Sequence, residues 1–316
     1  MSGTGGFQTQ VYQQPVMAIA GDFASANPYF TFNAGPGGLV SGAAGVVIGR
    51  FAWVYPPDDP NGTGMIVSNV GNGPVSGFVH REQQGTITQF LAFAGMGILP
   101  GQQMALMTGG DFWVVNDGAT IAQPNMKAYA NLADGKVTFA ATAAPAESFS
   151  VTASVAASTS SVTGSISGDL MTVTAVGSGV LRPGTTLSGT GVVTGTKIVS
   201  QVSGTPGGIG TYLVDPSSQV VASTTISGTY GTMTVTAVGS GAVNLGAVIA
   251  GSGVVAGTRV TQFITGTGGT GTYAVDNNTV VASTTITGTG NVETKWFANS
   301  TGLAGELVKI SSQPLG

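Results

Sequence analysis

Apolar and polar residues alternate along much of the second half of the chain. Residues 171–175 read MTVTA, which is the pattern of a strand with one buried and one wet face. The first half instead has short apolar runs, such as Gly45–Val54, Met65–Val70 and Phe112–Val115, separated by Gly, Pro, Asn and Asp. Short strands with frequent turns predict a small barrel or sandwich. One segment, Glu82–Ala94, has weak helical potential because it contains Gly and Thr.

Two near-identical copies of one segment carry the alternating pattern. The nine residues MTVTAVGSG occur at 171–179 and again at 233–241. Three further pairs of blocks follow at similar offsets: GVVTGTK with GVVAGTR, GTYLVD with GTYAVD, and VVASTTISG with VVASTTITG. Agreement over four blocks indicates a tandem duplication. We therefore expect two superposable β-sandwich-like modules, at residues 162–228 and 229–290.

Aromatic residues divide the chain into two kinds of region. All three Trp residues, at positions 53, 113 and 296, lie outside the duplicated segment. Because large aromatics supply much of the buried area of a core, residues 1–152 and 291–316 are expected to form one discontinuous domain. The duplicated modules would interrupt this domain at a loop, an insertion that is tolerated when the two ends of the insert lie close together. Thr152–Ser161, which reads TASVAASTSS, would be the linker that leads into the modules.

The composition sharpens the choice of fold class. Charged residues make up 7 % of the chain and Gly accounts for 52 of its 316 residues, so disorder is the first alternative. Against disorder, 42 % of the residues are hydrophobic, and β-branched residues are frequent, which favours strands. The sequence thus predicts an all-β protein, with a discontinuous β-barrel or sandwich domain that carries two inserted β modules.

Several classes of function are excluded or disfavoured. The chain has no Cys and a single His, so disulfides, thiolate zinc sites and Cys nucleophiles are absent. The net charge is −4, and without a basic patch there is no electrostatic footprint of a nucleic-acid-binding protein. No apolar run approaches the roughly 18 residues that span a bilayer, and the first residues do not resemble a secretory signal. We expect a protein made in the cytoplasm, with neither membrane nor nucleic acid as partner.

Three motifs suggest chemistry, and each has a structural interpretation that fits better. Gly266–Gly271 matches G-x-G-x-x-G, but a strand is expected to follow it where a dinucleotide site needs a helix. Pro56–Gly62 gathers oxygen ligands suited to calcium, yet the same residues are selected by tight turns. His80 has no nucleophile-elbow sequence to serve. We therefore expect no catalytic residue, no metal and no cofactor.

Short motifs on both sides of the duplication carry a family resemblance. They are Ala20–Ser25, Asn33–Val40, Val47–Trp53, Gly77–Gln84, Gly110–Val114, Glu293–Trp296 and Gly305–Ser311. In these motifs the first domain resembles the structural cement, or capsid decoration, proteins of phages. The resemblance covers most of residues 1–152 and all of 291–316. It implies a β-barrel-like fold that binds the outside of an assembled capsid, and it implies no catalytic residues.

The expected function is that of a non-enzymatic virion protein on the outer capsid surface, which clamps neighbouring major capsid subunits while its modules project outward. Its partners would be the major capsid protein and further copies of itself, in a trimer by preference or a dimer. The alternative is an adhesin or fibre module that binds a host surface or glycan. Five residues are candidates for capsid or subunit contacts. Phe7, Tyr12 and Pro15 lie in a Gln-rich arm, Gly6–Val16, that could add to a neighbour's sheet edge, and Arg81 and Glu82 could form an ion pair within the domain or across an interface.

Overall fold

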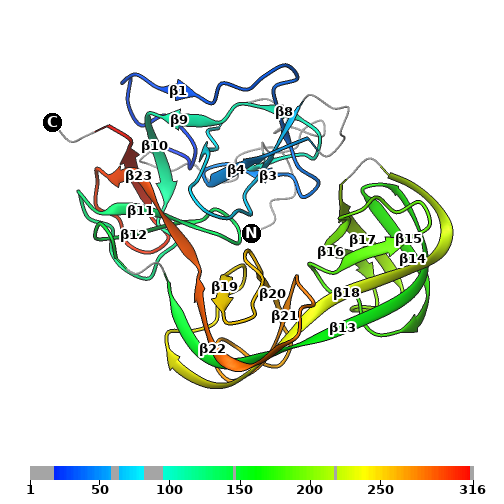
Figure 1. The fold of residues 1–316 in the computed structure, drawn as a ribbon. Coiled ribbons are helices and arrows are strands. Elements are labelled where there is room, and N and C mark those ends of the chain that lie inside the picture. The colour runs from blue at the N-terminus through cyan, green and yellow to red at the C-terminus, as the bar shows by residue number, and fades with distance from the viewer. Residues whose placement is uncertain (1–17, 58–63, 82–94, 145–146, 217–218, 314–316) are drawn as a thin grey trace, which may run out of the picture. The chain divides into compact units, whose positions relative to one another are not determined.

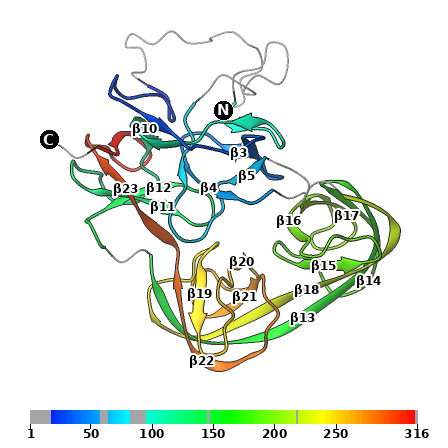
Figure 2. The same ribbon diagram turned by 45° about the horizontal axis from the view of Figure 1, so that its top comes forward.

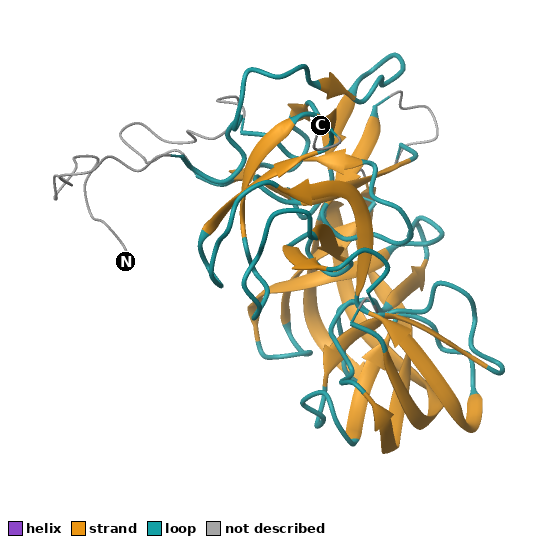
Figure 3. Cartoon of the chain, turned by 90° about the vertical axis from the view of Figure 1, so that its left-hand side faces the viewer, coloured by secondary structure: helices purple, strands orange, loops and turns teal. Residues whose placement is uncertain are grey.

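A computed structural model of the chain describes residues 18–57, 64–81, 95–144, 147–216 and 219–313. All regular elements within these ranges are strands, so the expected all-β fold class is confirmed (Figure 3). The weak helix expected at Glu82–Ala94 lies outside the described residues. The chain separates into two compact units: unit 1 is drawn from Met1–Pro56, Thr63–Ala144 and Val292–Gly316, and unit 2 from Pro57–Gly62 and Pro145–Asn291.

Unit 1 contains a seven-stranded sheet with the order β1-β9-β6-β4-β5-β2-β8. These strands are short: β1 Phe30–Thr31, β2 Leu39–Ser41, β4 Phe51–Tyr55, β5 Met65–Ser68, β6 Gly77–Phe78, β8 Gln103–Met104 and β9 Met107–Gly109. Only the β2–β5 pair among them is parallel. Two further strands, β3 Val46–Val47 and β7 Gly97–Ile98, pair with each other. The apolar run expected as one strand over Gly45–Val54 is therefore broken, and Gly49 at the break has a positive φ of 78°.

The second sheet of unit 1 joins the middle of the chain to its last strands. Its order is β10-β24-β23-β11-β12, where β10 is Asp111–Val115, β11 Lys127–Asn131, β12 Val137–Ala140, β23 Asn291–Ala298 and β24 Leu307–Ser311. Trp296, on β23, is 1 % exposed, and its ring centroid lies 5.1 Å from that of Phe51 on β4. The two sheets of unit 1 therefore share one aromatic core.

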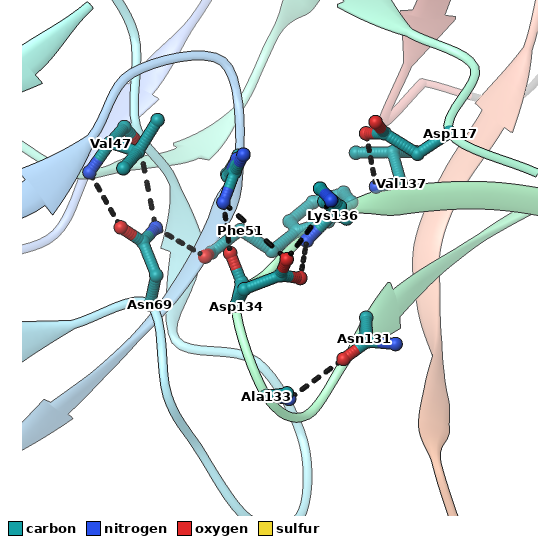
Figure 4. A network of polar contacts seen from close by, with 10 residues as sticks. Val47, Phe51, Asn69, Asp117, Asn131, Ala133, Asp134, Lys136 and Val137 are labelled. Carbon is teal, nitrogen blue, oxygen red and sulfur yellow. Dashed lines mark hydrogen bonds and ion pairs between the residues drawn. The ribbon is translucent and has the colours of Figure 1, made fainter. Parts of the chain in front are cut away.

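A network of polar contacts connects the two sheets of unit 1, near β4 and the β11–β12 turn (Figure 4). Asn69 accepts a hydrogen bond from the Val47 amide (2.6 Å) and donates to the Phe51 carbonyl (2.9 Å). Asp134, in the β11–β12 turn, lies 3.6 Å from the Arg50 guanidinium and 3.4 Å from Lys136 Nζ. The next residue, Gly135, has a φ of 68°, and a Cβ there would collide with the Phe51 carbonyl. Glycine is thus required where this turn meets β4.

Unit 2 is one continuous sheet that is closed twice. The first closed ring, ring 1, follows the order β13-β14-β17-β16-β15-β18 and returns to β13. The strands are β13 Phe149–Gly168, β14 Leu170–Ser178, β15 Thr186–Gly189, β16 Lys197–Gly204, β17 Gly210–Asp215 and β18 Gln219–Ser240. Its core contains apolar residues between Val162 and Ile226, with Met171 and Tyr212 among the largest.

Ring 2 repeats this arrangement with the second copy. It follows the order β13-β18-β21-β20-β19-β22 and returns to β13, where β19 is Val248–Gly251, β20 Val260–Phe263, β21 Gly271–Val275 and β22 Val281–Thr289. In ring 2, β19 is linked to the residue just before β20 by one pair, Val248 with Arg259. The corresponding pair in ring 1 is Thr186 with Lys197. The two copies of the duplicated segment thus take the same topology.

The two rings share β13 and β18, which run side by side for their whole length (Figures 1 and 2). In β13 the buried positions are the odd-numbered Val151, Ala153 and Val155, and then the even-numbered Val162 and Ile166. Successive side chains of a strand point to opposite faces. The change from odd-numbered to even-numbered buried positions therefore means that opposite faces of β13 are buried in the two rings. Residues 149–155 belong to the core of ring 2 and residues 162–166 to that of ring 1.

The prediction of a linker at Thr152–Ser161 is therefore wrong. These residues are the middle of β13, where the strand passes from one ring to the other. Small Ala, Ser and Thr side chains suit a linker, but they also suit this crossing, where Ser158 and Thr232 hydroxyls bond at 2.8 Å. Gly228 and Gly231 on β18 lie opposite, and a Cβ on Gly231 would collide with the Asn277 carbonyl. Ring 2 consequently begins upstream of the boundary expected for the second module.

Candidate functional site

Three of the motifs that carried the family resemblance meet at one place in unit 1. The segment Gly21–Ala24 lies antiparallel to the start of β10: the Gly21 amide donates to the Trp113 carbonyl (2.7 Å), and the Ala24 amide donates to the Asp111 carbonyl (2.9 Å). On the other side, the Arg81 amide donates to the Gly21 carbonyl (2.9 Å). The segment 21–31 is thereby fixed against β10 and β9 through backbone hydrogen bonds.

Aromatic side chains on this segment form a row that runs from solvent into the core. Phe23 lies 4.8 Å from Tyr29, 4.6 Å from His80 and 5.3 Å from Phe112, measured between ring centroids. Phe112 is buried, whereas Phe23 is 38 %, Tyr29 56 % and Phe30 62 % exposed. We call Phe23, Tyr29 and Phe30 the aromatic patch. Three large rings from one short segment that face solvent are typical of a surface that meets a partner.

Two glycines allow the aromatic patch to lie close to the sheet. A Cβ on Gly109 would come within 3.0 Å of the Phe30 ring, and one on Gly110 within 3.0 Å of Tyr29 Cβ. Gly110 also has a φ of 133°, which strains any other residue. The Gly109-Gly110 step therefore serves both as the turn between β9 and β10 and as the floor under the patch.

A buried carboxylate anchors the loop that carries the patch. Asp111 Oδ2 accepts hydrogen bonds from Ser25 Oγ (2.6 Å) and Asn27 Nδ2 (2.7 Å). Burial by itself would raise the pKa of Asp111, but hydrogen bonds from Ser25, Ser311 and Asn27, together with the charge of Lys309, outweigh it and leave the pKa below the usual value. Asp111 therefore stays ionised at neutral pH and holds residues 25–27 in place.

Of the five contact residues predicted from the sequence, Arg81 is described. Its Nη1 lies 3.6 Å from Asp22 Oδ1, and both side chains are partly exposed. Glu82, Phe7, Tyr12 and Pro15 lie outside the described residues, as does most of the turn at Pro56–Gly62. The structure thus places Arg81 beside the segment that carries the aromatic patch, in an ion pair with Asp22.

The remaining motifs with possible chemistry take structural places. The loop Gly266–Gly271 joins β20 to β21, as a turn, and wraps the hydroxyl of Tyr273, which donates to the Gly269 carbonyl (2.6 Å). A strand and not a helix follows this loop, as the sequence predicted. His80 packs against Phe23 and Phe112. Among the described residues, no group of three or more His, Asp or Glu side chains is placed to hold a metal ion.

A hollow of about 220 Å³ in unit 2 is lined mainly by ring 1, with Gln262 of ring 2 on its wall. Arg182 on its wall donates from Nη1 to Gln262 Oε1 (2.7 Å), and the buried Tyr212 donates to the Gly208 carbonyl (2.6 Å). The bond between Arg182 and Gln262 joins the two rings, and the bond between Tyr212 and Gly208 fixes the loop between β16 and β17. Tyr230 and Tyr273 are buried as well, which leaves Phe263, 38 % exposed, as the one open aromatic ring among the described residues of unit 2.

Sequence reasoning did not find the aromatic patch. The motif Ala20–Ser25 pointed to this region, but nothing in the sequence shows that Tyr29 and Phe30 remain exposed, because that depends on the two glycines of a distant turn. Within the described residues, no helix is both long and apolar enough to cross a bilayer. A protein-family model described as XM1 gp53 minor capsid protein matches residues 7–175, which include the aromatic patch, β10 and all of β13. No curated protein matches the chain.

Proposed function

Because the chain belongs to the XM1 gp53 minor capsid protein family, we propose that it is a non-enzymatic structural protein of a phage virion, which decorates the outer capsid surface and stabilises contacts between major capsid subunits. The protein would be made in the host cytoplasm and would join the particle as a homo-oligomer, by preference a trimer. The observation that carries this proposal is the aromatic patch within the part of unit 1 that the family covers.

The aromatic patch has the properties of a binding anchor. Tyr29 and Phe30 each present a large ring to water, which is unfavourable unless a partner covers it. Their backbone is held by β9 and by the Asp111 network, so little conformational entropy remains to be lost when a partner binds. Aromatic side chains on a rigid support are frequent centres of binding energy at interfaces. We therefore assign the contact with major capsid subunits to this patch.

Arg81 and the N-terminal arm are assigned secondary contacts. Arg81 is already paired with Asp22, so a cross-subunit ion pair would have to replace an existing one at little gain. Phe7, Tyr12 and Pro15 of the arm Gly6–Val16 remain candidates for contact with a neighbouring subunit, where an extended chain gains backbone hydrogen bonds at a sheet edge. Glu82 remains a candidate for the same interface.

Capsid stabilisation would follow from mass action. A protein that binds the assembled lattice and not free subunits lowers the free energy of the lattice by an amount set by its concentration and affinity. This requires no chemistry at the binding surface. The low charge of the chain, 7 % of residues, suits a contact made by apolar packing and backbone hydrogen bonds more than by charge.

The test is the double substitution Tyr29→Ala with Phe30→Ala, assayed by sedimentation of the protein with purified capsids that lack it. Loss of two anchor rings is expected to weaken binding at least about 10-fold. The matched control is Val202→Ala with Val220→Ala, two exposed apolar residues of unit 2, which should leave binding unchanged. Unaltered capsid occupancy by the Tyr29/Phe30 variant, with an intact fold by circular dichroism, would remove the patch from the proposal.

Unit 2 is proposed to project outward and to be dispensable for capsid binding. Phe149 and Gly288 are paired residues, so the ends of unit 2 lie side by side and a short Gly/Ser bridge can replace residues 147–290. Particles decorated with the shortened protein should lack outer density but keep the density of unit 1 in electron micrographs. An adhesin that stacks glycans on aromatic rings is disfavoured because four of the five aromatic residues of unit 2 are buried.

A further inference from the structure

The two rings of unit 2 have almost the same sequence but are built from different stretches of chain. Every core residue of ring 1 lies between Val162 and Ile226, so a single continuous segment supplies all six of its strands. The core of ring 2 runs from Val235 and its neighbours to Ile286, but it also contains Phe149, Val151, Ala153 and Val155. One strand of ring 2 therefore comes from upstream of ring 1.

That upstream strand contains one copy of a second, shorter duplication. Residues 150–155 read SVTASV and residues 161–166 read SVTGSI, eleven positions later on the same strand. Their pairings correspond as well: Val151 lies opposite Val238 and Ile286, and Val162 lies opposite Val176 and Ile226. The strand register shifts at the same place in both, after Ser150 and after Ser161. Each ring thus uses one copy of this motif as its first strand.

The spacing of eleven explains why the rings occupy opposite faces of β13. An odd spacing places equivalent side chains on opposite sides of a strand, so Val151 and Val162 point into different cores. β18 makes the same change, from the even-numbered Ile226 in ring 1 to the odd-numbered Met233 and Val235 in ring 2. The copy at 150–155 fits ring 2 only because β13 and β18 are held together along their whole length.

We propose that ring 2 is a strand-complemented structure: residues 149–155 act as its donor strand, and ring 1, which is complete without them, presents that strand in register. The donor residues and Met233 are separated by the entire length of ring 1 in sequence. Closure of so long a loop carries an entropic cost. Folding of ring 1 brings the two ends of this loop together, because Val155 lies opposite Met233 in the continuous β13–β18 pair. Ring 2 therefore depends on ring 1, and ring 1 does not depend on ring 2.

The test uses two matched substitutions in the full-length protein, Val151→Asp and Val162→Asp, followed by hydrogen exchange with mass spectrometry. Each places an unpaired carboxylate at the equivalent position of one core. The reporters are the equivalent strands β17 in ring 1 and β21 in ring 2, with β10 of unit 1 as the control for a folded chain. The milder pair Val151→Ala and Val162→Ala serves if either Asp variant is insoluble.

Val151→Asp should reduce the protection of β21 by a factor of at least about 100 while β17 stays within about threefold of the parent protein. Val162→Asp should reduce the protection of both reporters. Two outcomes overturn the proposal: a Val162→Asp protein in which β21 remains protected, which would make the rings independent, or a Val151→Asp protein in which β17 is lost as well, which would make them mutually dependent. Neither outcome bears on capsid binding by the aromatic patch.

Discussion

Unit 1 and unit 2 are both all-β, yet they hold their strands together by different means. Unit 1 has strands of two to eight residues, and its core is filled by large rings such as Phe51, Phe78, Phe112 and Trp296. Unit 2 has strands of up to 22 residues, and its cores consist mainly of Val, Ile, Leu and Ala. Where side chains are large, packing tolerates short, irregular strands. Where side chains are small, long and closed backbone pairing takes over.

The largest effect that this comparison predicts is for Trp296→Ala. Removal of a fully buried Trp costs about 3–5 kcal/mol, which is a large part of the stability of a typical domain. Because all three Trp residues belong to unit 1, tryptophan fluorescence reports on unit 1 alone. We expect the fluorescence transition in urea to move to much lower concentration, with a second transition of unit 2 retained in far-ultraviolet circular dichroism.

The half-buried Trp113 provides the control for that measurement, since Trp113→Ala removes a ring of the same size from β10. Its effect should be clearly smaller. Equal losses for Trp113→Ala and Trp296→Ala would mean that ring burial does not decide the stability of unit 1, and the comparison between the units would have to be drawn on other grounds.

An intermediate effect is predicted for acid, through Asp111. The pKa of Asp111 is lowered in the folded protein, so its stabilising contribution is present above the ordinary pKa of 3.8 and is lost as the pH falls through the lowered value. Asp111→Asn should cost about 1–2 kcal/mol at pH 7. It should also reduce the loss of stability below about pH 4.

Urea midpoints from tryptophan fluorescence, taken between pH 7 and pH 3, measure both effects of Asp111→Asn. The change should be confined to unit 1. If the variant and the parent protein lose stability in parallel as the pH falls, the hydrogen bonds from Ser25 and Asn27 do not depend on the charge of Asp111, and the account of how the patch is anchored is wrong.

The smallest effect is expected for the ion pair between the rings. Lys197 Nζ lies 3.0 Å from Asp276 Oδ2, and the Lys side chain is 43 % exposed. Such a pair contributes less than about 1 kcal/mol, so Lys197→Ala should barely change the unfolding of unit 2. The matched control is Lys136→Ala, which breaks an exposed pair within unit 1. A loss for Lys197→Ala well above 1 kcal/mol would show that side-chain charge, and not the shared strands, couples the rings.

The sequence predicted the class of fold and the duplication because both depend on local patterns. Alternation at 171–175 and four repeated blocks were sufficient for these. It did not predict the role of residues 149–161, since Ala, Ser and Thr have the composition of a linker, and the six-residue match between SVTASV and SVTGSI is too short to stand out among similar residues. What makes the segment a strand is the pairing with β18 more than 60 residues away.

The candidate site shows the same limit. The motifs around Asp22, Arg81 and Asp111 indicated the region of the candidate site, but the partner of Arg81 is Asp22. The exposed rings of Tyr29 and Phe30 follow from tertiary contacts with Gly109 and Gly110. Exposure of an aromatic ring is a property of the folded surface. A local pattern cannot report it, because the exposed Phe23 and the buried Phe112 both follow a Gly-Asp pair in the sequence.

The closed pairing of both rings has a consequence for how the protein behaves at high local concentration. An open sheet offers a row of unpaired backbone groups to any neighbour, and most soluble β proteins guard such edges with charge. Unit 2 belongs to a chain with few charges, but its strands pair around two circuits. Each strand that the structure describes in the two rings has a neighbour on both sides, although β15–β16 and β19–β20 meet at one residue pair each. Wherever many copies stand close together, as they would on one particle, adjacent copies therefore find only short unpaired stretches of these rings to extend. Particles that carry this protein can then remain dispersed without relying on electrostatic repulsion.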